Sequence, residues 1–465
     1  MQLPEKHTGL FTDHYELAMA QGYYKNGMKD VPAVFDYFFR RNPYHGGYVQ
    51  FGGLSGLLDS LENYRFSNDD CRYLERIGFS SDFISFLEDF HFGADLYAVK
   101  EGEIVFPTEP VVRVEGNVVE TQLIETLLLN TLNFESLIAT KAARIRQAAG
   151  DRLLVDFGLR RAQGMGGIQA SRAAIAGGFD KTSNVYSAFH FGLESTGTMA
   201  HSWVQSFPDE YQAFRAFADQ YPDDCILLLD TYDTLNSGLP NAIRVGKEME
   251  QAGGKLFGIR LDSGDLAYLS KQVRKMLDEA GMEYVRIVAS NQLDEYIIES
   301  LIDQHAPIDA FGVGTSLVTG KDEAALDGVY KLSMINGKPT MKLSDNIRKS
   351  TLPGRKSLYR FTDRNGMFFA DGIALDEEKE FSRIHHPFEA AKSTDISSFG
   401  KESLFEQVME KGKRLLEETS PQKIATHAQS RFSRLPAEQK RFLNPHTYKV
   451  GISSRLLEVR DKLGS

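Results

Sequence analysis

Residues 256–290 read LFGIRLDSGDLAYLSKQVRKMLDEAGMEYVRIVAS, and this stretch contains the pattern that predicts the fold. Leu256–Leu261 and Val285–Ser290 are short apolar segments that are typical of buried strands. Between them an amphipathic helix is expected to begin near Asp265 and to end at Ala280-Gly281. A strand, a helix and a second strand in this order predict two parallel strands that are joined by a crossover helix.

The same alternation extends through the middle of the chain. Five further strands are expected there, with helical patterns between most of them: Leu153–Phe157, Thr182–Asn184, Thr198–His201, Ile226–Asp230 and Ala310–Val313. Seven strands in one continuous stretch favour a closed, irregular α/β barrel over an open sheet. In such barrels the functional residues lie at the carboxyl ends of the strands.

The flanking regions have a different character. On the N-terminal side helices are expected at 14–22 and Thr121–Ala149, and strands at Val34–Phe39, Leu96–Val99 and Gly102–Val112. On the C-terminal side strands are expected at Val329–Met334, Gly337–Leu343 and Leu358–Phe361, followed by amphipathic helices at 401–418 and 436–443. The sequence thus predicts an N-terminal α/β domain (1–150), a barrel (151–328), and a last region (329–465) of strands that rejoin the N-terminal layer, followed by helices.

Composition limits the classes of function. The chain has 465 residues, of which 42% are hydrophobic and 25% charged, as in soluble globular proteins. Its 53 basic and 64 acidic residues give a net charge of -11, which argues against binding to nucleic acids or membrane surfaces. Its two cysteines, Cys71 and Cys225, exclude a disulfide framework. No apolar run approaches the length of a membrane helix or signal peptide, so a cytoplasmic protein is expected.

Three groups of polar residues follow the predicted strands. Gly312-Val313-Gly314-Thr315 can hold a phosphate through backbone N–H groups and a hydroxyl, or can be a glycine-rich strand exit without a ligand. Arg260, Asp262 and Asp265 combine a cation that suits phosphate with acids that suit Mg²⁺ or sugar hydroxyls. The alternative is a purely structural role for these residues, as an ion pair and a helix cap at Asp265.

The third group is a histidine with an acid. If Thr198–His201 and Ile226–Asp230 are adjacent parallel strands, Asp230 lies beside His201. A carboxylate on one ring nitrogen raises the basicity of the other, which suits a general base or a nucleophile. A purely structural histidine is the alternative.

Together these segments resemble the nicotinate phosphoribosyltransferase family. The matching stretches occur in one order up to about residue 370: Thr12–Leu17, Phe38–Arg40, Asn133–Lys141, Asp156–Arg161, Gly197–Ser202, Gly258–Asp265 and Gly312–Thr315. Residues beyond about 375 do not align clearly with the family pattern. The resemblance implies a type II phosphoribosyltransferase-like irregular α/β barrel with an N-terminal α/β domain, and sites that form at a homodimer interface.

The resemblance also implies a reaction. The family transfers a 5-phosphoribosyl group from phosphoribosyl pyrophosphate to nicotinate, giving nicotinate mononucleotide and pyrophosphate for NAD biosynthesis. ATP is a co-substrate of this ligase-type reaction, Mg²⁺ is the expected cofactor with ligands that are not assigned, and His201 is the expected phosphohistidine.

The resemblance implies roles for single residues too. Tyr15 of a neighbouring subunit and Phe157 are expected to enclose the pyridine ring, and Asp262 is expected to face the ribose or Mg²⁺. The remaining substrate-binding residues are Arg160, Ser183, Thr198, Arg260, Gly314 and Thr315. His201 and Asp230 are the expected catalytic pair.

Three alternatives remain open on the sequence alone. The first is the related nicotinamide enzyme, whose pattern has an Asp where this chain has Ser183; a serine hydroxyl can donate to a carboxylate, which favours nicotinate. The second is a sugar-phosphate lyase or isomerase that works without ATP. The third is a catalytically silent barrel that binds phosphorylated metabolites.

Overall fold

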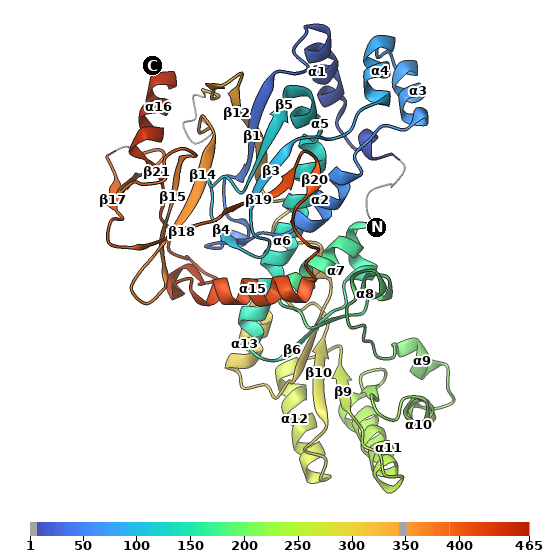
Figure 1. Cartoon of the computed structure of the whole chain (residues 1–465). Coiled ribbons are helices and arrows are strands. Elements are labelled where there is room, and N and C mark those ends of the chain that lie inside the picture. The colour runs from blue at the N-terminus through green and yellow to red at the C-terminus, as the bar shows by residue number, and fades with distance from the viewer. Residues whose placement is uncertain (1–6, 344–350, 390, 465) are drawn as a thin grey trace. The chain divides into compact units, whose positions relative to one another are not determined.

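The computed structural model describes residues 7–343, 351–389 and 391–464. The chain forms two compact units (Figure 1), of which unit 1 comprises Met1–Thr140 and Asp322–Ser465, and unit 2 comprises Lys141–Lys321. Unit 2 is therefore inserted into the sequence of unit 1. Among the described helices, none is both long enough and apolar enough to cross a membrane.

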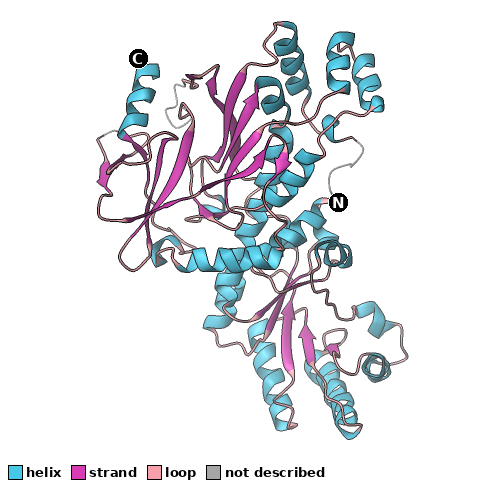
Figure 2. Ribbon diagram, in the orientation of Figure 1, coloured by secondary structure: helices cyan, strands magenta, loops and turns pink. Residues whose placement is uncertain are grey.

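Unit 1 is built on a seven-stranded antiparallel sheet (Figure 2) with the strand order β13-β12-β1-β5-β3-β19-β20. Its strands are β1 Pro32–Phe39, β3 Asp95–Val99, β5 Val112–Asn117, β12 Gly328–Ile335, β13 Lys338–Pro339, β19 Phe405–Glu410 and β20 Lys413–Arg414. β1 lies between β5 and β12, and its side chains are buried from Ala33 to Tyr37. The apolar strand predicted at Val34–Phe39 is therefore a central strand of the sheet.

A second sheet of unit 1 has six strands in the order β17-β16-β21-β15-β14-β18. Its strands are β14 Lys356–Thr362, β15 Phe368–Leu375, β16 Arg383–His385, β17 Ser393–Asp395, β18 Gly400–Ser403 and β21 Val450–Ser453, and a separate pair is formed by β2 Val49–Gln50 and β4 Ile104–Val105. The strands expected to rejoin the N-terminal layer thus belong to two different sheets. β12 and β13 are part of the first sheet, and β14 is part of the second.

The helices of unit 1 are α1 His14–Lys25, α2 Leu54–Glu62, α3 Asn68–Arg76, α4 Ser81–Glu88, α5 Val118–Leu123, α15 Pro421–Ser433, α16 Ser454–Gly464 and the first part of α6 Glu125–Ala149. The helix predicted from Thr121 is two helices, since α5 ends before Glu125. Asn117 begins α5 with a capping box, in which its side chain accepts hydrogen bonds from the backbone N–H groups of Val119 and Glu120. After α6, Gly150 has a φ of +61°, as expected for a helix-terminating glycine.

The prediction of helices at 401–418 and 436–443 is wrong. Residues 400–414 form β18, β19 and β20, and within 436–443 a single short 3-10 turn is found at Ala437–Gln439. The turn between β19 and β20 places Lys411 and Gly412 at positive φ, 48° and 74°, which is the backbone of a tight hairpin. Tertiary pairing of β19 with β3 overrides the helical charge pattern of this segment.

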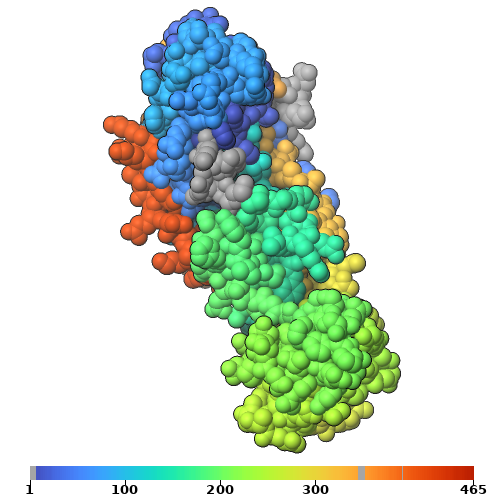
Figure 3. All heavy atoms as spheres, turned by 90° about the vertical axis from the view of Figure 1, so that its right-hand side faces the viewer, coloured from blue at the N-terminus to red at the C-terminus, as the bar shows by residue number. Residues whose placement is uncertain are grey.

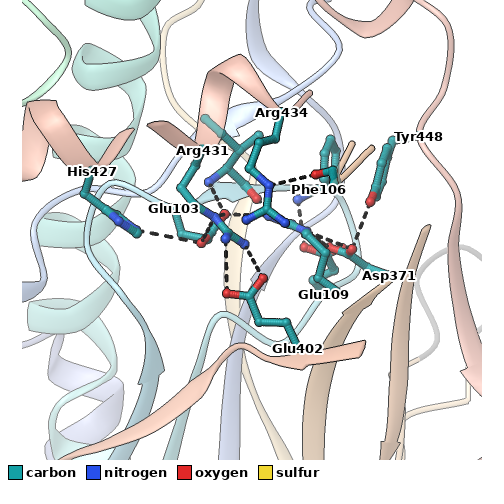
Figure 4. Close-up of polar contacts among 12 residues, drawn as sticks. Glu103, Phe106, Glu109, Asp371, Glu402, His427, Arg431, Arg434 and Tyr448 are labelled. Carbon is teal, nitrogen blue, oxygen red and sulfur yellow. Dashed lines mark hydrogen bonds and ion pairs between the residues drawn. The ribbon is translucent and has the colours of Figure 1, made fainter. Parts of the chain in front are cut away.

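A buried network of charges joins α15 to the second sheet of unit 1 and to the strand pair of β2 and β4 (Figure 4). Arg360 on β14 is fully buried and pairs with Asp371 on β15 at 2.6 Å and with Glu103 beside β4 at 2.5 Å. Arg431 of α15 contacts the same Glu103 carboxylate at 2.7 Å. We call these groups, with Glu109 and Tyr448, the Arg360 network. Both arginines of the network pair with carboxylates, Arg360 with Asp371 and Glu103, and Arg431 with Glu103, as buried charges require.

Unit 2 contains a six-stranded, entirely parallel sheet in the order β7-β6-β11-β10-β9-β8. The strands are β6 Leu153–Asp156, β7 Lys181–Thr182, β8 Ile226–Leu228, β9 Gly258–Leu261, β10 Arg286–Ser290 and β11 Ala310–Val313. The helices are α7 Gly166–Ala176, α8 Val185–Phe191, α9 His201–Gln205, α10 Glu210–Gln220, α11 Leu239–Gln251, α12 Leu266–Glu279, α13 Glu295–Asp303 and α14 Thr315–Val318. Green to yellow-green residues, from about 200 to 255, cover much of the face of unit 2 that Figure 3 shows.

The strand–helix–strand unit at 256–290 is confirmed. β9 and β10 pair in parallel and α12 joins them, beginning after the cap residue Asp265, whose side chain accepts a hydrogen bond from Tyr268 N at 3.0 Å. The prediction of a strand at Thr198–His201 is wrong, because these residues form an extended loop that ends where α9 begins at His201. The parallel α/β sheet is consistent with the expected irregular barrel. Its edge strands β7 and β8 are not paired with each other within the described residues.

Candidate active site

A pocket of about 750 Å³ opens in unit 2 at the carboxyl ends of the parallel strands. Eight of the residues expected to bind substrate line it: Phe157 and Arg160 after β6, Ser183 after β7, Arg260 and Asp262 on and after β9, and Gly314 and Thr315 after β11, with Thr198 from the loop before α9. The position matches the rule for α/β barrels, in which the loops after the strands form the site.

Phe157 lies against the glycines of β11. A Cβ atom on Gly312 would come within 2.3 Å of the Phe157 ring, so the absence of a side chain there allows the ring to lie on the strand. The guanidinium of Arg260 lies 5.9 Å from the centre of the same ring. The aromatic face is therefore beside a cation, an arrangement that suits a flat ring with an anionic substituent.

Arg260 is held by groups from two directions. Its Nη1 donates to the Thr198 hydroxyl and, at 3.2 Å, to the carbonyl oxygen of Met199, and its Nη2 lies 3.5 Å from Asp262 Oδ1. The side chain of Arg260 is only 13% exposed, which strengthens its electrostatic interactions. The loop before α9 and the end of β9 are thus joined by one guanidinium that faces the pocket.

Asp262 joins His201 to this wall. The Nε2 atom of His201 lies 3.7 Å from Asp262 Oδ2, and its Nδ1 atom lies 3.2 Å from the Thr231 hydroxyl. The other Asp262 oxygen accepts a hydrogen bond from the Ser290 hydroxyl at the end of β10. His201 itself does not line the pocket, whereas Asp262 does.

The predicted pairing of His201 with Asp230 is wrong in this structure. Asp230 accepts hydrogen bonds from the backbone N–H of Asp262 at 3.0 Å and from the hydroxyl of Ser263, and it makes no hydrogen bond or ion pair with His201 among the described contacts. The reason is that Thr198–His201 is a loop that leads into α9 rather than a strand beside β8. Asp230 therefore shapes the loop that contains Asp262, and Asp262 is the carboxylate that faces the imidazole.

Asp156 fixes the start of two other pocket loops. Its buried carboxylate accepts hydrogen bonds from Ser171 Oγ and Thr182 Oγ1, both at 2.7 Å, and from Gly158 N at 2.8 Å. Its carbonyl oxygen accepts a hydrogen bond from Ser183 N at 2.8 Å. Burial raises the pKa of Asp156, while these three hydrogen bonds favour its ionised form. Asp156 thus positions both the turn after Phe157 and the Ser183 backbone.

The sequence prediction omitted several residues of the pocket. Asn291 and Gln292 line it directly after β10 and have positive φ angles of 85° and 49°, which are uncommon for residues other than glycine. Such backbone is often found at ligand sites. Lys321 also lines the pocket. Asn291 is one of the polar residues that the sequence places after a predicted strand, although no role was predicted for it, whereas no sequence motif marks Gln292 or Lys321.

Tyr15 belongs to unit 1. It lies on α1 and lines a separate cavity of about 340 Å³ together with Thr126, Asn130 and Asn133. Burial and the nearby carboxylates of Glu125 and Glu16 raise the pKa of Tyr15, so its hydroxyl is un-ionised at neutral pH. The side chain is nevertheless 47% exposed.

Three family models match the chain. They are the nicotinate phosphoribosyltransferase N-terminal domain over residues 10–133, the nicotinate phosphoribosyltransferase family over residues 153–391, and the nicotinate phosphoribosyltransferase C-terminal domain over residues 355–460. The last match extends the family likeness well beyond residue 370, where the sequence pattern alone became unclear.

Individual proteins give the same result. A nicotinate phosphoribosyltransferase of Bacillus subtilis is 45% identical, and the alignment covers 98% of this chain and 96% of that protein. The crystal structure of human nicotinic acid phosphoribosyltransferase matches with a TM-score of 0.87 and 30% identity, over 97% of this chain and 99% of that one. A Pyrococcus furiosus nicotinate-nucleotide pyrophosphorylase shares the fold, with a TM-score of 0.72 and 24% identity over 92% of this chain and 95% of that one.

Proposed function

This chain belongs to the nicotinate phosphoribosyltransferase family, and on that premise we propose that the pocket of unit 2 is its active site. The enzyme transfers a 5-phosphoribosyl group from phosphoribosyl pyrophosphate to nicotinate and thereby serves NAD biosynthesis. One observation supports the assignment most directly: Asp262, in the pocket wall, contacts both the histidine and the arginine that the family resemblance singled out.

We propose that nicotinate binds at the Phe157 end of the pocket. The pyridine ring would lie on the face of Phe157, and its carboxylate would be held by Arg260 and by the hydroxyls of Thr198 and Ser183. A guanidinium and hydroxyl donors form strong hydrogen bonds to a carboxylate, whereas a neutral amide gains less from the cation. This arrangement favours nicotinate over nicotinamide.

The transfer itself requires little proton movement. When the bond between the sugar and pyrophosphate breaks, positive charge develops on the sugar and negative charge on the leaving group. The pyridine nitrogen carries a lone pair and no proton, so nicotinate has to be positioned rather than deprotonated. Arg160 and Arg260 are the cations that we assign to the negative charges of the substrates, and Gly314 and Thr315 supply neutral donors.

We propose that ATP drives the reaction through phosphorylation of His201. Phosphoryl transfer from ATP to an imidazole nitrogen releases ADP, and hydrolysis of the phosphohistidine then releases phosphate. Asp262 faces Nε2 of the ring at 3.7 Å and would stabilise the positive charge that the ring acquires when the phosphoryl group is attached or released.

Mg²⁺ is the metal that we expect with these substrates. Among the described residues no group of three or more potential metal-binding side chains occurs, but Mg²⁺ in phosphate sites needs only one or two carboxylates in addition to substrate oxygens. Asp262 fits that requirement, because its carboxylate lines the pocket. When bound, Mg²⁺ would neutralise charge on the departing pyrophosphate.

We further propose that the enzyme is a homodimer. Helix α8, which follows Ser183, exposes the apolar side chains of Val185, Tyr186 and Phe189, with exposed fractions of 71%, 52% and 87%. An exposed apolar cluster of this kind is typical of a surface that binds another protein. In such a dimer, Tyr15 would complete the nicotinate site of the partner.

Product analysis tests the proposal. The protein is mixed with Mg²⁺, phosphoribosyl pyrophosphate and either nicotinate or nicotinamide, with and without ATP, and the products are identified by mass spectrometry. We expect nicotinate mononucleotide as the main product and a higher yield with ATP. An Arg260→Ala variant should lose the activity; if it retains full activity with nicotinate, the pocket is not the active site.

A further inference from the structure

Lys321 lines the pocket from the loop that follows β11. The short helix α14 begins at Thr315, and three backbone hydrogen bonds then turn the chain back on itself: Thr319 N to Thr315 O, Gly320 N to Leu317 O, and Lys321 N to Ser316 O. The turn requires positive φ at Gly320, which has a φ of +57°. As a result, one compact loop contributes Gly314, Thr315 and Lys321 to the lining of the pocket.

A buried acid holds this ammonium group. Nζ of Lys321 lies 3.1 Å from Oδ2 of Asp294, whose side chain is only 7% exposed. The other oxygen of Asp294 accepts a hydrogen bond from Ile297 N and so caps α13. Asp294 therefore has a fixed position at the start of a helix, and it fixes the position of the charge on Lys321 relative to the loop after β11.

The distribution of charge in the pocket gives Lys321 its role. Among the described residues that line the pocket, the other cations are Arg160 and Arg161 after β6 and Arg260 on β9. The loops after β10 and β11 supply neutral donors apart from Lys321. A phosphate held by the backbone of Gly314 and the Thr315 hydroxyl would keep its charge through the whole reaction. A cation at this place neutralises that charge.

We propose that Lys321 binds the 5-phosphate of the sugar, and that Asp294 is its positioning residue. This inference rests on the assignment of the pocket as the active site. It commits to the 5-phosphate rather than the pyrophosphate, because the charge of the 5-phosphate stays the same through the reaction, whereas the pyrophosphate leaves and its charge grows. The 5-phosphate is common to phosphoribosyl pyrophosphate and to nicotinate mononucleotide.

The first test is the variant Lys321→Met, which keeps the length of the side chain and removes its charge. Loss of one charge-assisted hydrogen bond should raise KM for phosphoribosyl pyrophosphate about 10- to 100-fold. The maximal rate should change less than about threefold, since the contact is equally strong in the bound substrate and in the transition state. Lys321→Arg should restore most of the affinity. Lys271→Met, on the exposed face of α12, is the matched control for loss of one positive charge in unit 2.

Binding measurements separate the two phosphates. By titration calorimetry, Lys321→Met should bind nicotinate mononucleotide about 10- to 100-fold more weakly and inorganic pyrophosphate as the wild type does. If pyrophosphate binding is weakened and mononucleotide binding is unchanged, the assignment to the 5-phosphate is wrong. If Arg260→Ala abolishes activity while Lys321→Met binds both ligands normally, Lys321 is not a ligand although the pocket is the active site.

The role of Asp294 is tested by Asp294→Asn, since asparagine caps a helix as well as aspartate but cannot pair with an ammonium ion. We expect KM for phosphoribosyl pyrophosphate to rise about 3- to 10-fold, with an unchanged unfolding temperature. Combined with Lys321→Met, the substitution should add nothing further, because both remove the same interaction. Additive effects in the double variant would show that Asp294 acts independently of Lys321.

Discussion

Ser183 illustrates how one side chain can select the substrate. Its hydroxyl lines the pocket, and its backbone is fixed by the hydrogen bond from Ser183 N to the Asp156 carbonyl. We expect Ser183→Asp to raise KM for nicotinate at least about tenfold, because two carboxylates would then face each other in a partly dry site. Steady-state kinetics with nicotinate provides the measurement.

Ser183→Ala is the matched control for this prediction. It removes the hydroxyl without adding charge, so its effect on nicotinate should be clearly smaller than that of the aspartate. Wild-type kinetics for Ser183→Asp would exclude Ser183 from contact with the nicotinate carboxylate.

The roles of Asp262 and Asp230 in the phosphorylation of His201 can be distinguished experimentally. With γ-labelled ATP, Asp262→Asn should reduce acid-labile labelling of the protein about 10- to 100-fold, since the ring loses a charged partner. Asp230→Asn should reduce it less than about threefold, because an amide oxygen can still accept from Asp262 N and Ser263 Oγ. His201→Asn should carry no label.

The opposite labelling result would support the pairing of His201 with Asp230 that the sequence suggested. If Asp230→Asn abolishes labelling and Asp262→Asn does not, the geometry at His201 changes when ATP binds. Circular dichroism of both variants, compared with that of the wild type, shows whether either substitution disturbs the fold.

At the scale of secondary structure, the sequence predicted the elements with strong local patterns. β9, α12, β10 and β11 are found close to where apolar runs and caps placed them, and the ends of β9 and β11 gave four residues that line the pocket, Arg260, Asp262, Gly314 and Thr315. The errors lie where long-range contacts decide. The segment 198–201 has the apolar and β-branched residues of a strand but has no partner in the sheet, and β19 exists because β3 is beside it.

Residues with no local signal could not be found in this way. Lys321 reaches the pocket only because a turn after α14 reverses the chain, and Asp262 faces His201 only because α9 begins there. The contact between Asp262 and His201 joins residues far apart in sequence, and no motif marks the turn before Lys321.

The Arg360 network makes the stability of unit 1 dependent on pH. Burial and the negative charge of Asp371 raise the pKa of Glu109 well above its ordinary value. A raised pKa means that the folded state binds the proton more tightly than the unfolded state. The stabilisation is therefore complete below the ordinary pKa of about 4.3 and is lost as the pH rises toward the raised value.

Glu109→Gln tests this relation. A glutamine resembles the protonated acid: its oxygen can accept from Phe106 N, as Glu109 does at 2.9 Å, and its NH₂ group can donate to Asp371. In thermal unfolding, the variant should match the wild type below about pH 4.3 and become progressively more stable than it as the pH rises above that value. Glu109→Ala, which leaves Phe106 N without this partner, should be less stable at every pH. A constant difference between glutamine variant and wild type would contradict a titrating Glu109.

At the scale of the whole molecule, the proposed homodimer makes a quantitative prediction. Tyr15→Ala and Arg260→Ala should each inactivate the enzyme, one in unit 1 and the other in unit 2. If Tyr15 serves the partner's pocket, random exchange of the two variant chains gives half heterodimers, each with one intact site of two. About a quarter of wild-type activity should return on mixing.

Native mass spectrometry of the mixture confirms that exchange has occurred. Two Tyr15→Ala preparations mixed with each other serve as the control and should stay inactive. Heterodimers without recovered activity would show that each pocket is completed by its own chain.

The insertion of unit 2 also has a consequence for biosynthesis on the ribosome. Ala33 of β1 pairs with Ile335 of β12, and Val99 of β3 pairs with Phe405 of β19, so the first sheet joins segments that are translated far apart in time. At a translation rate of about 5–20 residues per second, β12 is synthesised about 15–60 s after its neighbour β1. During that interval the nascent chain exposes an apolar strand with an open hydrogen-bonding edge, while unit 2 is translated and can begin to fold. The yield of native enzyme in a cell should therefore depend on translation speed and on chaperones that bind β1. It should depend far less on the folding of unit 2.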